Sequence, residues 1–340
     1  MKSIYSITKK DLENYFTSHN DKKYRATQIY EWLYRKKVKS FDDMTNINKS
    51  TIELLKKDFY FNNLEIVRKQ EDELVKKYLF KLSDGNKIES VLMYHDYGLS
   101  ICISSQIGCN MGCAFCESGR LKKVRNLTSD EMLLQVLEVE EDVGERISHI
   151  VIMGIGEPFD NYDNFMDFIN IVNDPYGPAI GSRHITVSTS GIVPKIYEFA
   201  DLNIGVNLAI SLHAPNNEIR NKIMKVNKAY PIEEIIKAVN YYISKTNRRV
   251  TFEYILLNGI NDTDECANEL TKLIRGINCY VNLIPYNETS HINLKRSKED
   301  RINRFYDVLK KNKINVTIRK EFGSKVSAAC GQLRSESEGK

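Results

Sequence analysis

The sequence lacks long apolar runs. None of its 340 residues belongs to a stretch approaching the roughly 18 uncharged apolar residues of a membrane span, and the opening MKSIYSITKKDLENYF has no apolar core of a secretory signal. The chain is also neither repetitive nor composed like a disordered protein. Its hydrophobic fraction, 42 %, is enough for one large α/β core with a small appended domain. We therefore expect a cytoplasmic protein without membrane contact.

The seven cysteines do not indicate a disulfide framework. Their number is odd and four of them fall within residues 102–116, which suits a metal site in a reducing compartment better than paired bridges. The net charge of +4 is too small to demand an anionic partner. Runs of Lys and Arg could still add up to a phosphate-binding surface, although each alone is more typical of a solvated face. They lie at residues 22–25, 35–39, 122–125 and 295–298.

Three of the cysteines, Cys109, Cys113 and Cys116, have the spacing C-x3-C-x2-C directly after a β-like run. Three thiolates on one loop can bind three irons of a cubane cluster and leave the fourth iron without a protein ligand. A closed zinc site, the alternative, needs a fourth Cys or His at short spacing. No His lies between residues 96 and 148, and the next cysteine is Cys266. The spacing therefore favours an open iron–sulfur cluster that binds and cleaves a cofactor.

The chain begins with a helical segment and continues with a β-rich one. In residues 1–60, Thr8 is expected to cap a helix, and Trp32, the only tryptophan, lies on an apolar helical stripe and is expected in the core. Residues 77–82 and 87–93 flank Ser-Asp-Gly-Asn, which predicts a hairpin. We therefore expect a small helical N-terminal domain over 1–60 and a short β connector over 61–98.

Residues 99–340 alternate apolar strands with amphipathic helices, the first of which is expected to begin at Thr128 with a capping box. This pattern predicts six β/α units with a parallel sheet, an α/β fold curled as a partial (β/α)6 TIM-like barrel. The strands are expected at residues 99–103, 149–153, 184–188, 206–211, 249–257 and 280–284. Active sites of such barrels lie at the C-terminal strand ends, where the three-cysteine loop also falls.

Polar residues follow four consecutive strand ends. A Gly-Ile-Gly-Glu-Pro motif contains Gly156 and Glu157, and Ser188, Ser211 and Asn287 follow the next strands or end them. Together they are typical of a cofactor lining, although each one alone is equally consistent with a cap or turn. The remaining cysteines are expected to be inert buried thiols when judged singly; they are Cys102, Cys266, Cys279 and Cys330.

The three-cysteine spacing resembles the radical S-adenosylmethionine superfamily, and the whole chain resembles its RlmN/Cfr family of RNA methyltransferases. The resemblance rests on stretches that occur in the family's order from near the start of the chain to its end. They are YRA and WLY at residues 24–34, CISSQIGC at 102–109, GIGEP at 154–158, STSG at 188–191, SLHAPN at 211–216, NLIP at 282–285 and AACGQL at 328–333.

The resemblance implies a set of site residues. Cys109, Cys113 and Cys116 would hold a 4Fe-4S cluster, whose open iron chelates S-adenosylmethionine, and Glu89 matches the family's proton acceptor. From the strand pattern alone, Glu89 would instead be expected to face solvent. The implied contacts of S-adenosylmethionine are Gly156, Glu157, Ser188, Ser211, Leu212, His213 and Asn287.

The resemblance also implies a two-stage methyl transfer that uses two S-adenosylmethionine molecules per turnover. The first methylates the thiolate of Cys330 by displacement. The second is cleaved at the cluster, and its 5′-deoxyadenosyl radical takes a hydrogen from the S-methyl group. The carbon radical adds to adenine and gives a protein–RNA adduct. Cys102 resolves the adduct and leaves a Cys102–Cys330 disulfide that must be reduced.

The family has two branches, which differ in the carbon that is methylated. Housekeeping members act on adenine carbon 2 in 23S rRNA and on adenosine 37 of tRNA, and the antibiotic-resistance branch acts on carbon 8 of the same rRNA adenosine. Pro158, Ile107 and the segment around Trp32 resemble the first branch. The second branch, and an RNA-binding protein with a purely structural metal, are the alternatives. The resemblance further implies a monomer, RNA docking on the N-terminal domain and a flavodoxin-type electron donor.

Two positions depart from the family pattern. Glu117 directly follows the third cluster cysteine where a small residue is usual, and a carboxylate there can change the cluster potential. Lys-Val-Ser at residues 325–327 replaces an acidic segment before the Cys330 loop. Both bear on substrate choice and on loop movement.

Overall fold

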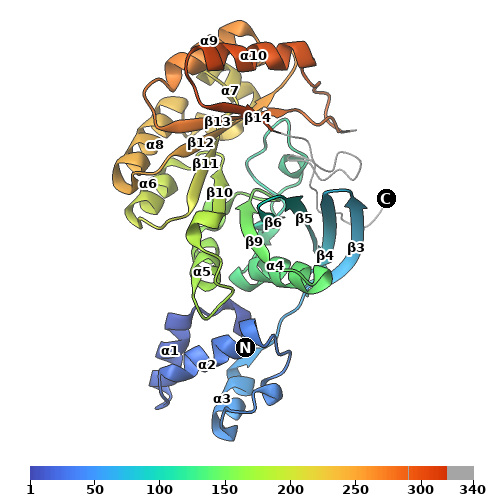
Figure 1. The fold of residues 1–340 in the computed structure, drawn as a ribbon, viewed down its shortest axis with the longest axis vertical. Helices are drawn as coiled ribbons and strands as arrows, with labels where there is room; N and C mark the ends of the chain where they lie inside the picture. Colours follow the sequence, from blue (N-terminus) through green and yellow to red (C-terminus); the bar gives the residue numbers. More distant parts are fainter. Residues whose placement is uncertain (290, 320–340) are drawn as a thin grey trace.

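The computed structural model describes residues 1–289 and 291–319, so Cys330 and residues 325–327 lie outside it. Figure 1 shows α1–α3 at one end of the molecule and α9 and α10 at the other. None of the helices within the described ranges is both long and apolar enough to span a membrane. The helices are α1 Lys9–Ser18, α2 Tyr24–Tyr30, α3 Lys49–Asp58, α4 Ser129–Val143, α5 Tyr162–Asn173, α6 Val193–Asp201, α7 Asn217–Ile223, α8 Ile232–Thr246, α9 Asp264–Leu273 and α10 Glu299–Lys311.

The N-terminal helices form as the sequence predicts. The Thr8 hydroxyl accepts a hydrogen bond from the backbone N–H of Asp11 at 3.2 Å and donates to its carboxylate at 2.7 Å, which starts α1. Trp32 is buried, and its indole N–H donates to Asn46 at 2.6 Å. Its place in the core is thus confirmed.

One sheet of ten strands organises the rest of the described chain. Its spatial order is β14-β13-β12-β11-β10-β9-β6-β5-β4-β3. The strands are β3 Glu65–Asp72, β4 Val75–Lys81, β5 Lys87–His95, β6 Gly98–Ile103, β9 Ile147–Ile152, β10 Ile185–Thr189, β11 Asn207–Ser211, β12 Val250–Leu256, β13 Cys279–Pro285 and β14 Val316–Ile318. From β6 to β14 all neighbours are parallel. The six expected parallel strands are confirmed, and β14 adds a seventh.

The β connector continues the same sheet in antiparallel fashion. Strands β3, β4, β5 and β6 pair in sequence order, and β4 and β5 form the predicted hairpin. Antiparallel neighbours need only a tight turn, which Gly85 provides at a φ of 84°. Strand β5 consequently lies inside the sheet, and residues 88–93 are all buried.

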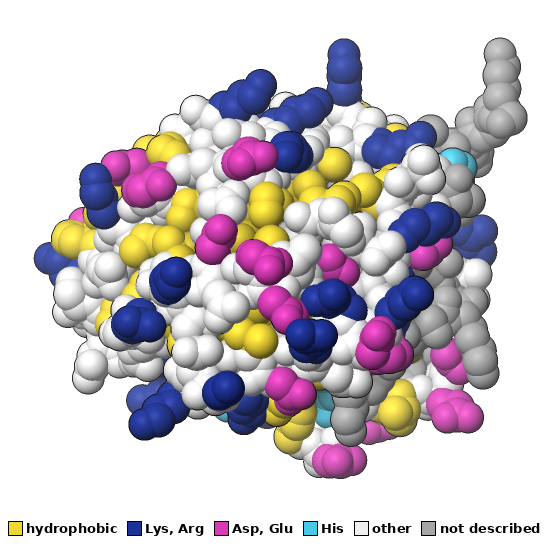
Figure 2. Space-filling view, turned by 90° about the horizontal axis from the view of Figure 1, so that it is seen from above, with side chains coloured by type: hydrophobic (Ala, Val, Ile, Leu, Met, Phe, Trp, Pro, Cys, Tyr) yellow, Lys and Arg dark blue, Asp and Glu magenta, His cyan; other side chains and the backbone are white. Residues whose placement is uncertain are grey.

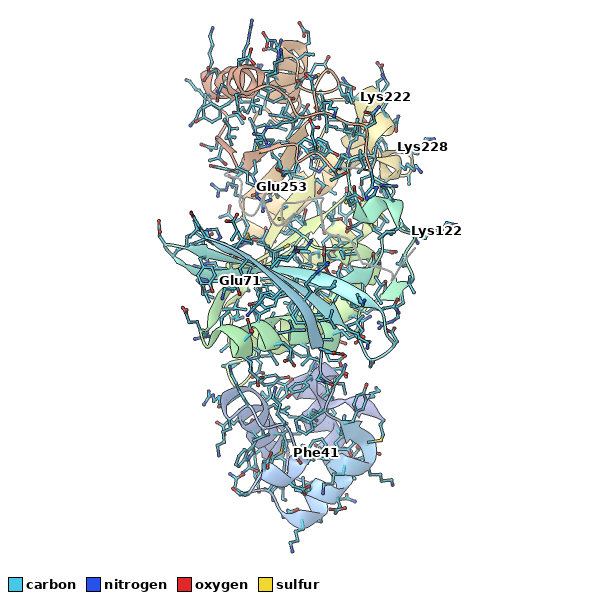
Figure 3. All side chains as sticks on the ribbon, turned by 90° about the vertical axis from the view of Figure 1, so that its right-hand side faces the viewer. Phe41, Glu71, Lys122, Lys222, Lys228 and Glu253 are labelled. Atoms are coloured by element: carbon cyan, nitrogen blue, oxygen red, sulfur yellow. The ribbon has the colours of Figure 1, made fainter. Side chains whose placement is uncertain are left out.

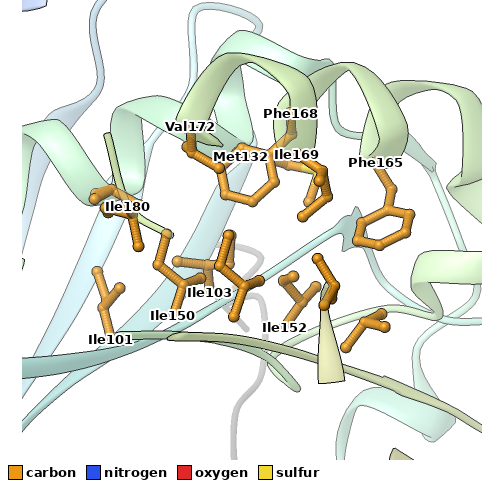
Figure 4. Close-up of a cluster of buried hydrophobic side chains, with 14 of the residues drawn as sticks. Ile101, Ile103, Met132, Ile150, Ile152, Phe165, Phe168, Ile169, Val172 and Ile180 are labelled. Carbon is orange, nitrogen blue, oxygen red and sulfur yellow. The ribbon is translucent and has the colours of Figure 1, made fainter. Parts of the chain in front are cut away.

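Helices α4 and α5 cover one face of β6 and β9. Thr128 and Glu131 form the predicted capping box of α4. Figure 4 shows Met132 of α4 and Phe165 of α5 above Ile101, Ile103 and the neighbouring strand β9. Because side chains alternate along a strand, Cys102 points to the opposite face, which we call the inner face.

Candidate active site

The loop that carries the three cysteines is folded back onto itself and onto α7. The backbone N–H of Cys109 donates to Leu121 at 3.0 Å, and that of Ala114 donates to Ile223 at the end of α7 at 2.9 Å. A Cβ at Gly119 would lie 2.9 Å from the backbone of Cys113, so only glycine lets these two segments approach. The loop therefore has a defined shape at the C-terminal end of β6.

All three cysteines line one cavity together with five of the seven residues expected to contact the cofactor. These residues are Cys109, Cys113, Cys116, Gly156, Glu157, Ser188, Ser211 and His213. Leu212 is instead buried in the main hydrophobic core, and Asn287 is not among the lining residues. The structure thus brings the ends of β9, β10 and β11 to the cysteine loop, as expected for a parallel sheet.

The donor set fits a cubane cluster. Among the described residues, no three His, Cys, Asp or Glu side chains converge closely enough to hold a single metal ion. A cubane binds each thiolate to a different iron, so its ligands stand farther apart than those of one zinc ion. Burial raises the pKa of the Cys109 thiol to about 12 and that of Cys113 well above its usual value. Metal binding must therefore supply the energy that deprotonates them.

Gly156 and Glu157 shape the cavity through backbone contacts. The Glu157 carboxylate accepts hydrogen bonds from the N–H of Ser190 at 2.7 Å and of Phe159 at 3.1 Å. Its own N–H donates to the Gln106 side chain at 2.9 Å. Burial raises the pKa of Glu157, and these hydrogen bonds oppose that shift. The carboxylate therefore fixes the loop after β9 against the loop after β10.

Replacing Gly156 with alanine is expected to destabilise the protein by about 1–3 kcal/mol. Gly156 has a φ of 107°, and a Cβ there would lie 2.6 Å from the Gln106 side chain. Gly85→Ala is the matched control, because Gly85 has a φ of 84° but no atom within 4 Å of the new Cβ. Denaturant unfolding should show the larger loss for Gly156→Ala. Equal losses in the two variants would mean that the contact with Gln106 is unimportant.

Ser188 and Ser211 lie next to each other at the ends of β10 and β11, with their hydroxyl oxygens 3.4 Å apart. Arg220 of α7 supports these strand ends from below the surface. Its buried guanidinium donates to the carbonyls of Ser190, Ser211 and Leu212 at 2.6–3.1 Å. Arg220 could not be predicted from the sequence, because nothing in the residue pattern distinguishes it from an exposed helical arginine.

His213 is fixed as a neutral imidazole. It has a φ of 57°, its Nδ1 accepts a hydrogen bond from the N–H of Ile255 at 3.0 Å, and its ring packs edge-on against Phe115 at 4.8 Å. Burial, followed by the charge of Arg220, lowers the pKa of His213 to about 3. Since Phe115 lies between Cys113 and Cys116, His213 braces the cluster loop.

This depressed pKa predicts a dependence of stability on pH. Below pH 6.5 the unfolded chain takes up a proton at His213 that the folded protein refuses until about pH 3. The free energy of unfolding should therefore fall as the pH drops from 6.5 towards 3, by up to about 1.4 kcal/mol per pH unit. In urea unfolding, the difference between wild type and His213→Asn should shrink as the pH falls. His19→Asn, at the exposed end of α1, is the control, and a pH-independent difference would contradict the prediction.

Glu253 and Arg319 also line the cavity, and the sequence interpretation missed both. Glu253 of β12 is buried and accepts a hydrogen bond from the Asn282 amide at 2.9 Å. Burial raises the pKa of Glu253, and the charge of Arg319 opposes the rise. Figure 3 shows Glu253 inside the molecule. The signal that could have identified Glu253 is a single carboxylate within an otherwise apolar predicted strand.

Glu89 is buried, so the expectation from the strand pattern that it faces solvent is wrong. The reason is that β5 lies inside the sheet, where the Nζ of Lys77 on β4 reaches the Glu89 carboxylate at 2.7 Å. Val91 pairs with both Lys77 and Cys102, so Glu89, two residues from Val91, shares their face of the sheet. Cys102 and Glu89 thus both lie on the inner face.

Two cysteines lie outside the cavity and away from the inner face. Cys266 and Cys279 are buried in the main core, as expected for inert thiols. No disulfide joins any two cysteines in the described part of the chain.

Glu117 is buried beside the cluster loop, with its Oε2 3.6 Å from Arg120, and its Oε1 accepts no hydrogen bond from a described residue.

Comparison with known proteins identifies the family. The ribosomal RNA large subunit methyltransferase N-terminal domain matches residues 3–60, and the radical SAM superfamily matches residues 103–270. "Probable dual-specificity RNA methyltransferase RlmN" of Enterococcus faecalis is 55% identical over 98% of this chain and 96% of its own length. The chain belongs to the RlmN family of radical SAM methyltransferases. The Streptococcus mutans protein of the same description is also 55% identical, over 98% of this chain and 95% of its own.

Solved structures agree with membership of the RlmN family. A radical SAM methyltransferase from Sphaerobacter thermophilus superposes with a TM-score of 0.92 at 41% identity, over 99% of this chain and all of that one. The α/β radical SAM fold is therefore confirmed, and so is an enzyme that uses a 4Fe-4S cluster and S-adenosylmethionine. The alternative of an RNA-binding protein with a structural metal finds no support.

Proposed function

We propose that this RlmN-family protein methylates carbon 2 of an adenosine in 23S rRNA and of adenosine 37 in tRNA. The observation that supports it best is the arrangement on the inner face. Cys102 lies on β6, the strand that leads into the cluster loop, and the Glu89–Lys77 ion pair lies on the neighbouring strands β5 and β4. The names of the relatives, which describe dual-specificity RNA methyltransferases, agree with two RNA substrates. Pro158 and Ile107 resemble the housekeeping branch of the family, which favours carbon 2 over carbon 8.

Cys330 and Glu89 have different roles in the proposed reaction. When bound, the cluster and S-adenosylmethionine supply a radical that removes one hydrogen from a methyl group. Cys330, whose loop lies outside the described residues, carries that methyl group on sulfur after accepting it from a first S-adenosylmethionine, so that each turnover uses two. Its methylene carbon, a radical after the loss of hydrogen, then bonds to adenine. The resulting adduct radical loses one electron, which the cluster would take back, and Glu89 accepts the proton that carbon 2 loses.

Cys102 ends the cycle. Its thiolate attacks the sulfur of Cys330, the bond from sulfur to the transferred carbon breaks, and the carbon gains a proton to become the product methyl group. Both cysteines end as a disulfide that a reductant must open. Lys77 holds the Glu89 carboxylate in place through the ion pair at 2.7 Å. A flavodoxin-type donor supplies the electron for the cluster, and the protein acts as a monomer.

The test is incubation of cluster-reconstituted protein with S-adenosylmethionine, a reductant and each unmodified RNA, followed by chromatography of the nucleosides. The proposal expects 2-methyladenosine from both RNAs. Only 8-methyladenosine would instead assign the chain to the resistance branch. Glu89→Gln, which keeps the shape but cannot take up the proton, should lower the yield by at least about a hundredfold.

A further inference from the structure

A second, larger cavity adjoins the cluster loop on its outer side. It is a groove of about 720 Å³ lined by residues of the loops that follow β9, β10 and β11. Asn110 and Met111 of the cluster loop complete its wall, and Met111 also lines the cofactor cavity. Only a short stretch of the cluster loop thus separates the groove from the cofactor cavity. Apolar side chains that face it include Ile192, Val226 and Tyr230.

Two lysines, Lys195 and Lys225, line the groove together with Asp160 and Asp163, and Lys228 directly precedes the lining residue Ala229. Lys122, Lys225 and Lys228 are exposed, and none of them forms an ion pair with a described residue. Lys225 lies over the cluster loop, because a Cβ added at Gly112 would lie 3.2 Å from the Lys225 side chain. Figure 3 shows Lys122, Lys222 and Lys228 on one side of the molecule, away from the N-terminal helices. By contrast, the end of the molecule seen in Figure 2 mixes Lys and Arg with Asp and Glu.

We propose that this groove and its lysine rim dock the acidic flavin-carrying protein that reduces the cluster. The inference rests on the proposed function, which requires a one-electron donor. One electron passes from the carrier to the oxidised cluster, so the carrier loses one electron and the cluster gains one. The donor never needs to reach adenine, and in the groove it would contact the cluster loop at Asn110 and Met111, directly after Cys109.

RNA is the competing occupant, and the placement of the groove disfavours it. The RNA base must reach Glu89 and Cys102 on the inner face, and the domain that matches the rRNA methyltransferase family lies at the far end of the molecule. Of the residues that line the groove, only Met111 also lines the cofactor cavity. An acidic carrier would be steered by the lysine rim, and its association should weaken as salt rises because exposed charges are screened.

The experiment compares Lys122→Glu/Lys228→Glu with a control of equal charge change, Lys310→Glu/Lys311→Glu at the exposed end of α10. The probe is a bacterial flavodoxin, titrated calorimetrically against reconstituted protein at low and high salt. Stopped-flow absorbance measures cluster reduction by flavodoxin hydroquinone and, separately, by dithionite. RNA affinity is measured on the same samples. Ala229→Trp, which fills the groove without changing charge, is the second variant.

The proposal expects the charge-reversal variant to lose flavodoxin affinity and reduction rate by at least about tenfold. Reduction and methylation driven by dithionite, and RNA affinity, should stay within about twofold of wild type, as should all properties of the control. Unchanged flavodoxin affinity in both groove variants would overturn the proposal. Loss of RNA affinity instead would make this an RNA surface. If dithionite-driven methylation failed in wild type, the proposed function would fall while the binding data still decided the docking site.

Discussion

Replacing Cys102 with alanine is expected to leave the protein covalently attached to its RNA. Without the Cys102 thiolate, nothing displaces the transferred carbon from the sulfur of Cys330, so the reaction stops at the adduct. Cys102 lies on the inner face, packed with Val91, Met93 and Ile155, and Met153 of this cluster also lines the cofactor cavity. After incubation with RNA, denaturing electrophoresis should show a band of protein plus RNA, and free methylated RNA should be absent.

Cys266→Ala is the matched control for this prediction, because Cys266 is equally buried but lies on α9 in the main core. It should release methylated RNA at the wild-type rate. Cys330→Ala should give neither adduct nor product, because the methyl carrier is gone. RNA-free Cys102→Ala protein recovered from a reaction that yields product would contradict the role of Cys102.

Replacing Cys113 with alanine is expected to abolish cleavage of S-adenosylmethionine. A cubane held by three protein ligands loses one of the three, and the half-buried thiol of Cys113 lines the cavity beside Cys109 and Cys116. Anaerobic reconstitution should then yield little bound iron and no visible absorption from a cluster, and 5′-deoxyadenosine should fall below detection.

Cys279→Ala serves as the control for the cluster ligands, since Cys279 begins β13 in the main core. Its iron content should match that of wild type. Full iron content and cofactor cleavage in Cys113→Ala would contradict the assigned ligand set. One tightly bound zinc per chain in wild type, with no iron, would favour the zinc alternative.

Local spacing is why much of the site could be predicted from the sequence. The cysteines at 109, 113 and 116 lie on one loop, and Glu157, Ser188 and Ser211 each follow or end an apolar strand, so a parallel sheet necessarily brings them together. Capping at Thr128 and the hairpin at Gly85 are likewise set by a few consecutive residues. Such features depend little on distant parts of the chain.

Buried charges could not be predicted, because their surroundings come from distant segments. Glu89 is buried because β5 lies inside the sheet and Lys77 reaches it from β4. Arg220 and Arg319 look like ordinary surface cations in the sequence, yet one binds strand-end carbonyls and the other lines the cavity. The pairing of the β connector with β6 is also a tertiary choice that no local pattern specifies.

The central claim is that the methyl group passes through a cysteine of this protein to adenine carbon 2. The most direct test is nucleoside mass spectrometry after many turnovers with S-adenosylmethionine whose methyl group carries only deuterium. The account predicts 2-methyladenosine with two deuterium atoms and one hydrogen from solvent, because one deuterium leaves with 5′-deoxyadenosine. A product that retains all the deuterium, or a methyl group at carbon 8, would contradict it.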